Sequence, residues 1–305
     1  GDDIYIGRNH EPLPNCTGDE QSTRCHGVAR DVHISNVRSL RNSRQGMSLV
    51  AGQDIIVEDS EFSWTQGACP QAGIDLEPSS GGEPVHNITF RRLVMRNNTG
   101  GGMQLPVDPF PFAPGGLPLL ITVEDVHIIG ANWSAKNDGC TSAGIGFILG
   151  PMRSVGSITF NRCSASELPS VGFLVQSKAM SSIDRKGQYG KKGGSVTAAK
   201  LSVTNLTLHN TALRPIVQFS TVESPIVLAA ITRNQYNWTM GNISLDGVTV
   251  VNSLPRPWLS AGVLGPYSVQ APVAHISGSA RVLTPSKDGC AVDSSSPVDV
   301  ETDCS

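Results

Sequence analysis

A short repeated spacing of apolar residues constrains the fold of this chain more than any other feature. The unit is apolar-x-apolar, two residues that favour a turn, and then apolar-x-apolar again. The residue before the second pair often turns easily, as at Asn36, Asp59, Asp125, Asn205 and Gly247. Each copy therefore predicts two short strands separated by a tight bend. The copies are Val32/Ile34/Val37/Ser39, Ile55/Val57/Ser60/Phe62, Ile88/Phe90/Leu93/Met95, Ile121/Val123/Val126/Ile128, Ile158/Phe160/Cys163/Ala165, Leu201/Val203/Leu206/Leu208 and Ile243/Leu245/Val248/Val250.

A third short strand, usually opened by a glycine, lies between successive copies. A chain with three strands in every turn coils, and each strand pairs with its equivalents above and below. The pattern predicts an all-β fold, a parallel β-solenoid of about eight or nine turns with one interior column of apolar side chains. The third strands are expected at Asp3–Gly7, Gly46–Val50, Gly73–Glu77, Gly102–Leu105, Gly144–Ile148 and Gly172–Gln176.

The composition fits this architecture and excludes several classes of partner. Glycine (32) and proline (20) are plentiful, whereas aromatic residues make up 5% and charged residues 16% of the chain. Such a chain suits many short strands and turns. The formal net charge of -3 and the pI near 6.2 argue against nucleic acid and anionic membranes as partners. No apolar run reaches the ~18 residues of a membrane span, so we expect none.

Three segments carry a family resemblance. Gly1–Gly7, Asn42–Val50 and Ala72–Pro78 resemble successive turns of right-handed parallel β-helix proteins of the pectin-lyase-like superfamily. The resemblance covers about residues 1–285 and implies a right-handed parallel β-helix domain there. It does not fix the activity, because this fold hosts lyases, hydrolases, epimerases, phage tailspikes and adhesins.

The two ends of the chain depart from the repeat. Residues 286–305 lose it, and we expect them to form a disulfide-containing tail that caps the last turn. No amphipathic helix precedes the first strand, although solenoids usually need a cap against edge-to-edge pairing. We therefore expect either a fragment of a longer chain or a partner, through self-assembly or capping, at the N-terminal turn.

The strand Gly73–Glu77 carries the strongest candidate for chemistry. If Ile74 and Leu76 point inward, Asp75 and Glu77 stand side by side on the outer face. Their carboxyls are then roughly 5 to 8 Å apart, given a two-residue strand rise of about 6.6 Å. That range suits paired carboxylates that hydrolyse glycosidic bonds, one as proton donor and the other as nucleophile or base. Asp75 and Glu77 are the candidate catalytic residues.

Neighbouring turns supply candidate substrate-binding residues. Tyr5, Ser48 and Gln104 share the outer strip with Asp75 and are expected to bind substrate. Ser48 and Gln104 are expected to bind sugar hydroxyls, whereas Arg44 is expected to hold an acidic sugar group. Two other interpretations stay open. The carboxylates are hydrated surface groups, or they bind Ca²⁺ with Gln104, backbone carbonyls or water completing the shell.

Lyase chemistry is disfavoured, because the strip contains no lysine to act as a base. The polygalacturonase pattern of Gly-His-Gly, paired Asp-Asp and Arg-x-Lys is also missing, so no catalytic residue carries over from the resemblance. No cofactor and no dedicated metal site is expected.

Sequons and cysteines indicate a secreted, extracellular and eukaryotic glycoprotein. Cys16 with Cys25 and Cys290 with Cys304 are expected to form local disulfides near the two ends, and Cys163 is expected to be a buried thiol. Cys69 and Cys140 stay unassigned. The seven Asn-X-Ser/Thr acceptors are Asn15, Asn87, Asn97, Asn132, Asn205, Asn237 and Asn242.

Two classes of function remain open at this point. In the first, the protein binds or cleaves a polysaccharide in a groove floored by the strip from Tyr5 to Gln104. In the second, it is a non-catalytic structural glycoprotein of a wall, sheath or filament, with the solenoid as scaffold. The strip favours the first, and the sequons and the uncapped first turn favour the second.

Overall fold

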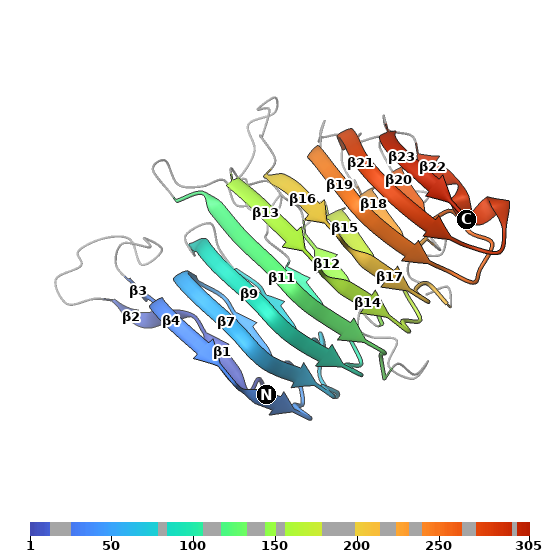
Figure 1. Cartoon of the computed structure of the whole chain (residues 1–305). Coiled ribbons are helices and arrows are strands. Elements are labelled where there is room, and N and C mark those ends of the chain that lie inside the picture. The colour runs from blue at the N-terminus through green and yellow to red at the C-terminus, as the bar shows by residue number, and fades with distance from the viewer. Residues whose placement is uncertain are drawn as a thin grey trace.

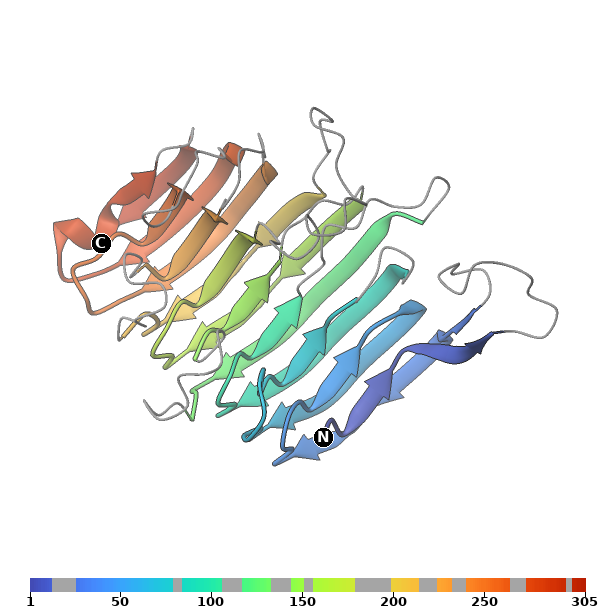
Figure 2. The same ribbon diagram turned by 180° about the vertical axis from the view of Figure 1, so that it is seen from behind.

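The computed structural model describes residues 1–12, 26–78, 84–105, 117–132, 144–150, 156–178, 199–213, 224–231, 240–263, 273–294 and 298–305. In these ranges the chain is all-β and contains no α-helix; its one helical element is the 3-10 helix η5 (Lys287–Cys290). No helix there is long and apolar enough to cross a membrane. The strands form two large parallel sheets whose members follow one another along the molecule from the N-terminus to the C-terminus (Figures 1 and 2).

The smaller sheet contains the third strands of the repeat. Among the described residues it is nine-stranded, in the order β1-β6-β8-β10-β12-β15-β18-β20-β22, and every neighbouring pair is parallel. Its strands are β1 (Ile4–Ile6), β6 (Met47–Leu49), β8 (Ile74–Leu76), β10 (Met103–Leu105), β12 (Phe147–Leu149), β15 (Phe173–Lys178), β18 (Ile226–Ile231), β20 (Leu259–Val263) and β22 (Val292–Ser294).

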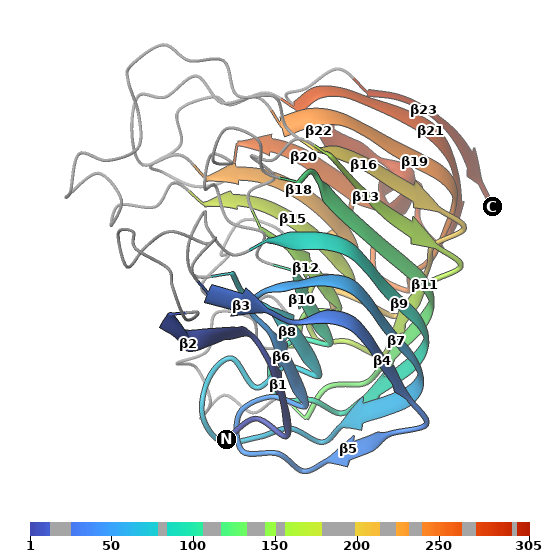
Figure 3. The same cartoon turned by 90° about the vertical axis from the view of Figure 1, so that its left-hand side faces the viewer.

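The larger sheet contains the paired strands of each copy and is twelve-stranded in the described ranges. The chain alternates between the two sheets, which lie on opposite sides of a shared interior (Figure 3). An antiparallel pair, β2 (Arg8–Pro12) with β3 (His26–Val28), stands apart. The strands of the larger sheet are β4 (Arg30–Ser35), β5 (Arg38–Leu40), β7 (Gly52–Ser63), β9 (Val85–Arg96), β11 (Leu119–Ile129), β13 (Gly156–Asn161), β14 (Ser164–Ser166), β16 (Lys200–Thr204), β17 (Thr207–His209), β19 (Met240–Val251), β21 (Val273–Leu283) and β23 (Val298–Cys304).

The apolar repeat forms the interior, as the sequence predicts. Ile55 pairs with Ile88 and Ile88 with Ile121, and the same register continues into later copies. All three residues are at most 2% exposed. Because apolar side chains of equal position stack on each other, each added strand buries its inward face against the previous one.

The bends between the paired strands adopt the left-handed backbone conformation. Asn36, Asp59, Asp125, Asn205 and Gly247 have φ between 50° and 63°, which confirms the turn residues inferred from the sequence. Asparagine, aspartate and glycine tolerate this region best, which explains their recurrence at one position of the repeat.

A glycine precedes several strands of the nine-stranded sheet, and these glycines lie at equivalent positions. At one strand, β12, the glycine at this position differs from the one expected from the sequence. Gly46, Gly73, Gly102 and Gly172 open their strands as predicted, but Gly146 rather than Gly144 occupies the equivalent place before β12. A Cβ on Gly146 would lie 2.3 Å from the Gly172 carbonyl oxygen, so close backbone approach requires glycine there. The spacing alone could not distinguish two glycines that lie two residues apart.

The C-terminal segment continues the architecture. Residues after 285 were expected to lose the repeat, yet β22 pairs with β20 and β23 with β21, both in parallel. The predicted Cys290–Cys304 disulfide joins η5 to the end of β23. The tail therefore adds one strand to each sheet and is fastened there by a covalent bond.

Removing this disulfide should loosen the last strands. The bond closes a loop of 14 residues, for which chain entropy predicts a loss of about 3 kcal/mol when Cys290 and Cys304 are both replaced by serine. Because β23 pairs with β21 alone among the described strands, we expect hydrogen exchange to accelerate in β23 while β9 stays protected. Unchanged exchange in β23 would contradict this account.

Candidate functional site

Strand β8 places the two candidate carboxylates in different environments. Ile74 and Leu76 are fully buried in the core, as predicted, and Asp75 and Glu77 project from the opposite side. Asp75, however, is only 2% exposed, whereas the side chain of Glu77 is 55% exposed. The expectation of two solvent-exposed carboxylates is therefore wrong for Asp75, because polar side chains of the preceding turn pack over it.

Gln45 is the main polar partner of Asp75, and sequence reasoning missed it. Its Nε2 donates a hydrogen bond to Asp75 Oδ2, and the residue is fully buried. Arg44 Nη1 donates to Gln45 Oε1 at 2.6 Å, and the Ser48 hydroxyl also contacts this oxygen. These contacts orient the amide so that its NH₂ group faces Asp75.

Arg44 and Ser48 connect the site to the first residues of the chain. Arg44 Nη1 lies 3.1 Å from Asp2 Oδ2, and Arg44 Nη2 lies 3.7 Å from Glu77 Oε2. The Ser48 hydroxyl lies 2.7 Å from the same Asp2 oxygen. Arg44, predicted to hold an acidic sugar group, thus has two carboxylates beside it and compensates charge within the protein.

The environment of Asp75 favours its neutral form. Burial, followed by the negative charge of Glu77, raises the pKa of Asp75 to about 8, whereas Arg44 opposes the shift. At neutral pH Asp75 therefore keeps its proton beside an exposed glutamate. Pairs of carboxyl groups whose environments separate their protonation states are typical of acid–base sites.

The outer strip follows the predicted order along the nine-stranded sheet. Tyr5 pairs with Ser48, Ser48 with Asp75, and Asp75 with Gln104. Beyond Gln104 the same face becomes apolar and buried, in a separate cluster with Ile145 and Val171 that contains Ile148, Leu174 and Val227 of the strip. The polar end is mostly covered as well: Ser48 and Gln104 are 3% and 8% exposed, and Tyr5 alone is largely open.

A calcium ion does not fit this arrangement. Gln45 directs an N–H donor at Asp75, and the Arg44 guanidinium occupies the approach to Glu77. Ca²⁺ needs six to eight oxygen ligands, which these groups do not supply. In the described ranges no three His, Cys, Asp or Glu side chains gather as a metal site.

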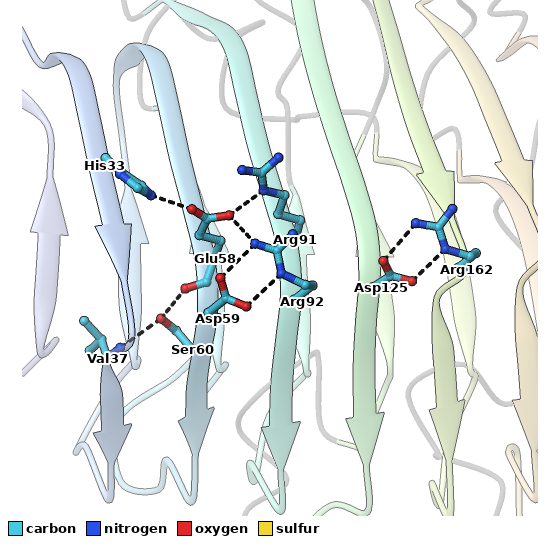
Figure 4. A network of polar contacts seen from close by, with 9 residues as sticks. All are labelled: His33, Val37, Glu58, Asp59, Ser60, Arg91, Arg92, Asp125 and Arg162. Carbon is cyan, nitrogen blue, oxygen red and sulfur yellow. Dashed lines mark hydrogen bonds and ion pairs between the residues drawn. The ribbon is translucent and has the colours of Figure 1, made fainter.

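A second polar network lies on the outer face of the twelve-stranded sheet (Figure 4). Glu58 accepts hydrogen bonds from Arg91 Nε and Arg92 Nη2, and its other oxygen lies 2.6 Å from His33 Nε2. Arg91, then His33 and Arg92, lower the pKa of Glu58 to about 2 against the opposing effect of burial. The side chain of His33 is 58% exposed, so this partner of Glu58 lies at the surface.

Charges alternate along this face. Asp59 pairs with Arg92, and Asp125 pairs with Arg162 two turns further on. Both arginines occupy left-handed bends, where the other turns carry asparagine, aspartate or glycine. Because acidic side chains of one strand lie beside arginines of the next, these cross-strand pairs stabilise the observed pairing of the strands. The network is structural.

Glu58 should give the protein an acid-sensitive stabilisation. A lowered pKa means that the folded state holds the proton less tightly, so the stabilisation is present above about pH 4.5 and is lost as pH falls toward 2. Glu58→Gln should lower the melting temperature at pH 7, and the difference from wild type should shrink toward pH 2. Glu61→Gln, which removes only the exposed pair with Arg38, serves as control. A difference that persists unchanged at pH 2 would contradict the assignment.

The described residues include five of the seven predicted glycosylation sites. Asn87, Asn132, Asn205 and Asn242 are exposed and Asn97 is half-buried; Asn15 and Asn237 lie outside the described residues. Asn87 and Thr89 of one sequon line a shallow surface hollow together with Asp54.

The remaining cysteines divide between the described and undescribed parts of the chain. Cys163 is a buried free thiol as predicted, and burial raises its pKa to about 11. Cys69 is disulfide-bonded, whereas Cys16, Cys25 and Cys140 lie outside the described ranges.

Comparison of the chain with protein-family models, with curated proteins and with solved structures gives no match. The functional assignment therefore rests on the geometry and electrostatics of the site.

Proposed function

We propose that this protein is an extracellular polysaccharide hydrolase built on a right-handed parallel β-helix of the pectin-lyase-like kind. The alternation of the chain between two parallel sheets supports this fold. So does the register of the apolar column, which supports about eight or nine turns. Its members are Val32, Ile55, Ile88, Ile121, Ile158, Leu201, Ile243, Ile276 and Val298.

The observation that carries the catalytic proposal is the asymmetry of the carboxyl pair. Asp75 is buried and holds a proton, and Glu77, two residues along the chain, reaches solvent. In this proposal Glu77 is the carboxylate that contacts the glycosidic bond, and Asp75 behind it stores the proton. This revises the sequence-based roles, in which both carboxyls face the substrate.

The reaction is hydrolysis by acid–base catalysis. The carboxyl pair delivers its proton to the leaving-group oxygen as the bond from this oxygen to the anomeric carbon breaks. A water molecule then adds to the anomeric carbon and returns a proton to the pair. The exposed Tyr5 ring offers a stacking surface for a sugar next to the site.

The extracellular location is part of the same proposal. The Cys290–Cys304 disulfide is typical of an oxidising compartment. Four exposed sequon asparagines support glycosylation, which mass spectrometry before and after enzymatic deglycosylation would detect.

The test is a screen of soluble polysaccharides for the release of reducing ends. We expect Glu77→Gln to reduce any activity by about 10²-fold or more, because the group that contacts the substrate is lost. Glu61→Gln is the matched control, since Glu61 is also an outward strand carboxylate paired with an arginine. Equal activity of the two variants would refute the assignment of Glu77, and no activity on any polysaccharide would refute the hydrolase.

A structural role is the second candidate function. It is favoured by the burial of Ser48, Asp75 and Gln104, which leaves most of the strip closed. In that case the carboxyl pair and the covered apolar face hold the turns together, and the protein serves as an extracellular scaffold. Wild-type protein that neither binds nor cleaves any polysaccharide would favour this role.

A further inference from the structure

Two buried polar atoms on neighbouring strands lack a hydrogen-bond partner. They are Asp75 Oδ1 on β8 and Gln104 Nε2 on β10. Asp75 is 2% and Gln104 8% exposed, so solvent does not reach these atoms freely. Buried polar groups are normally satisfied, and an unpaired donor next to an unpaired acceptor indicates that a bound group belongs between them.

The backbone brings these two side chains to the same face. Asp75 and Gln104 are register partners in a parallel pair, so their Cα atoms are about 4.8 Å apart and both side chains point away from the core. Both side chains therefore extend from neighbouring strands into the space outside the sheet.

Successive turns differ in the side chain that covers this face of the sheet. Gln45, three residues before Ser48, fills the equivalent space one turn earlier and donates to Asp75. The backbone bonds from Gly46 to Ala72 and from Gly73 to Gly101 show that Gln45 and Ala72 hold equivalent positions. Alanine is too short to reach Asp75 and Gln104. Where one turn supplies a side-chain amide, the next supplies only a methyl group, which does not fill the volume that the Gln45 amide takes up one turn earlier.

The chemistry of the two atoms limits what can fill this gap. The amide of Gln104 donates, and the Asp75 carboxyl donates when neutral and accepts when ionised. A hydroxyl group satisfies both partners in either state, because it is both donor and acceptor. An ammonium group or a metal ion would face the amide donor, and a carboxylate would face the acidic pair. Burial restricts the guest to hydroxyl size.

We propose that Asp75, Gln104 and the space left by Ala72 form a subsite for one hydroxyl group. Water fills it in the free protein, and a hydroxyl of the bound sugar replaces this water. The binding of a sugar hydroxyl rests on the proposed function and deepens that function. It requires that the substrate polysaccharide carry a free hydroxyl beside the bond that is cleaved. Gln104 is a binding residue in this proposal.

The first experiment is a crystal structure of the free protein at a resolution that shows ordered water. We expect one water within hydrogen-bond distance of both Asp75 Oδ1 and Gln104 Nε2, and its loss in Ala72→Gln, where the new amide fills the gap. Direct hydrogen bonding between Asp75 and Gln104, with nothing between them, would overturn the proposal whatever the activity.

The second experiment measures binding without cleavage. Calorimetry on the Glu77→Gln protein uses cellohexaose, xylohexaose and mannohexaose as probes. For a probe that binds, adding Gln104→Met or Ala72→Gln should weaken affinity about tenfold or more, because a buried hydroxyl loses its partner or its space. The matched control is Gln53→Met, which removes an amide of equal exposure (8%) from the other sheet and should leave affinity unchanged.

The outcomes separate the subsite from the hydrolase. Binding that weakens in the two subsite variants, by a protein that cleaves nothing, supports the subsite and refutes hydrolysis. Cleavage together with unchanged affinity in Gln104→Met and Ala72→Gln refutes the subsite and leaves the hydrolase standing. If no probe binds, the sugar hydroxyl is overturned as the occupant.

Discussion

Replacing Asp75 by asparagine should make the protein more stable at pH 8 than the wild type. The raised pKa of Asp75 means that the folded state favours the protonated carboxyl. The contribution of Asp75 to the stability of the wild type is therefore fully present below about pH 4 and falls as pH rises toward about 8, by up to about 1.4 kcal/mol per pH unit. Asparagine has no proton to lose and still offers an oxygen to Gln45, so the variant escapes this loss.

The same substitution should remove the activity that the proposed function assigns to the pair. Loss of a general acid typically costs 10²- to 10⁴-fold in rate. If the variant is more stable but inactive, the Asp75 carboxyl costs the wild type stability and is retained because the activity needs it. Chemical denaturation between pH 4 and pH 9, together with activity on any polysaccharide cleaved by the wild type, measures both effects.

The control for this prediction is a carboxylate with the opposite shift. Arg92 lowers the pKa of Asp59, so Asp59→Asn should destabilise the protein at pH 7. Equal effects of Asp59→Asn and Asp75→Asn on stability at pH 8 would contradict the distinction between the two sites.

Truncating Phe160 should cause the largest loss of stability of any single change considered. Its ring packs edge-on against Phe147 and Phe173, with centroid distances of 5.4 and 5.1 Å. Phe147 and Phe173 belong to the nine-stranded sheet and Phe160 to the other, so this fully buried cluster joins the two sheets. Phe160→Ala leaves a cavity there and should cost about 3 to 5 kcal/mol.

Phe160→Leu is the matched variant for this prediction. Leucine retains much of the buried volume, so the cost should be less than half as large. Urea denaturation followed by far-ultraviolet circular dichroism gives both values. If alanine and leucine cost the same, or if alanine costs under 1 kcal/mol, the cluster does not join the sheets as described.

The repeat explains why much of the fold could be predicted from the sequence. Inward positions such as Ile55 and Ile88 must be apolar in every turn, and bends such as Asn36 must tolerate a positive φ. Both requirements act over a few residues and recur, so they leave a periodic signal. Before β12 the periodic signal allows two registers, because Gly144 and Gly146 both fit the position that opens the strand. The sequence alone therefore does not show that Gly146 occupies it.

The site was predictable only in its main residues. The alternation in β8 is enough to place Asp75 and Glu77 on the outer face, but the burial of Asp75 depends on Gln45, thirty residues earlier. Glu58 likewise gains its partners from adjacent turns. One signal could have been used: Gln45, Ala72 and Gly101 share a position three residues before the strip, and Gln45 alone has a long side chain.

The most direct test of this account is a titration of the Asp75 carboxyl, followed by carbon-13 NMR with Asp75→Asn used to assign the signal. We expect a midpoint near pH 8, and a lower midpoint in Glu77→Gln, because the neighbouring charge is removed. A midpoint near pH 4, as in an ordinary exposed aspartate, would contradict the buried acid on which the proposed chemistry depends.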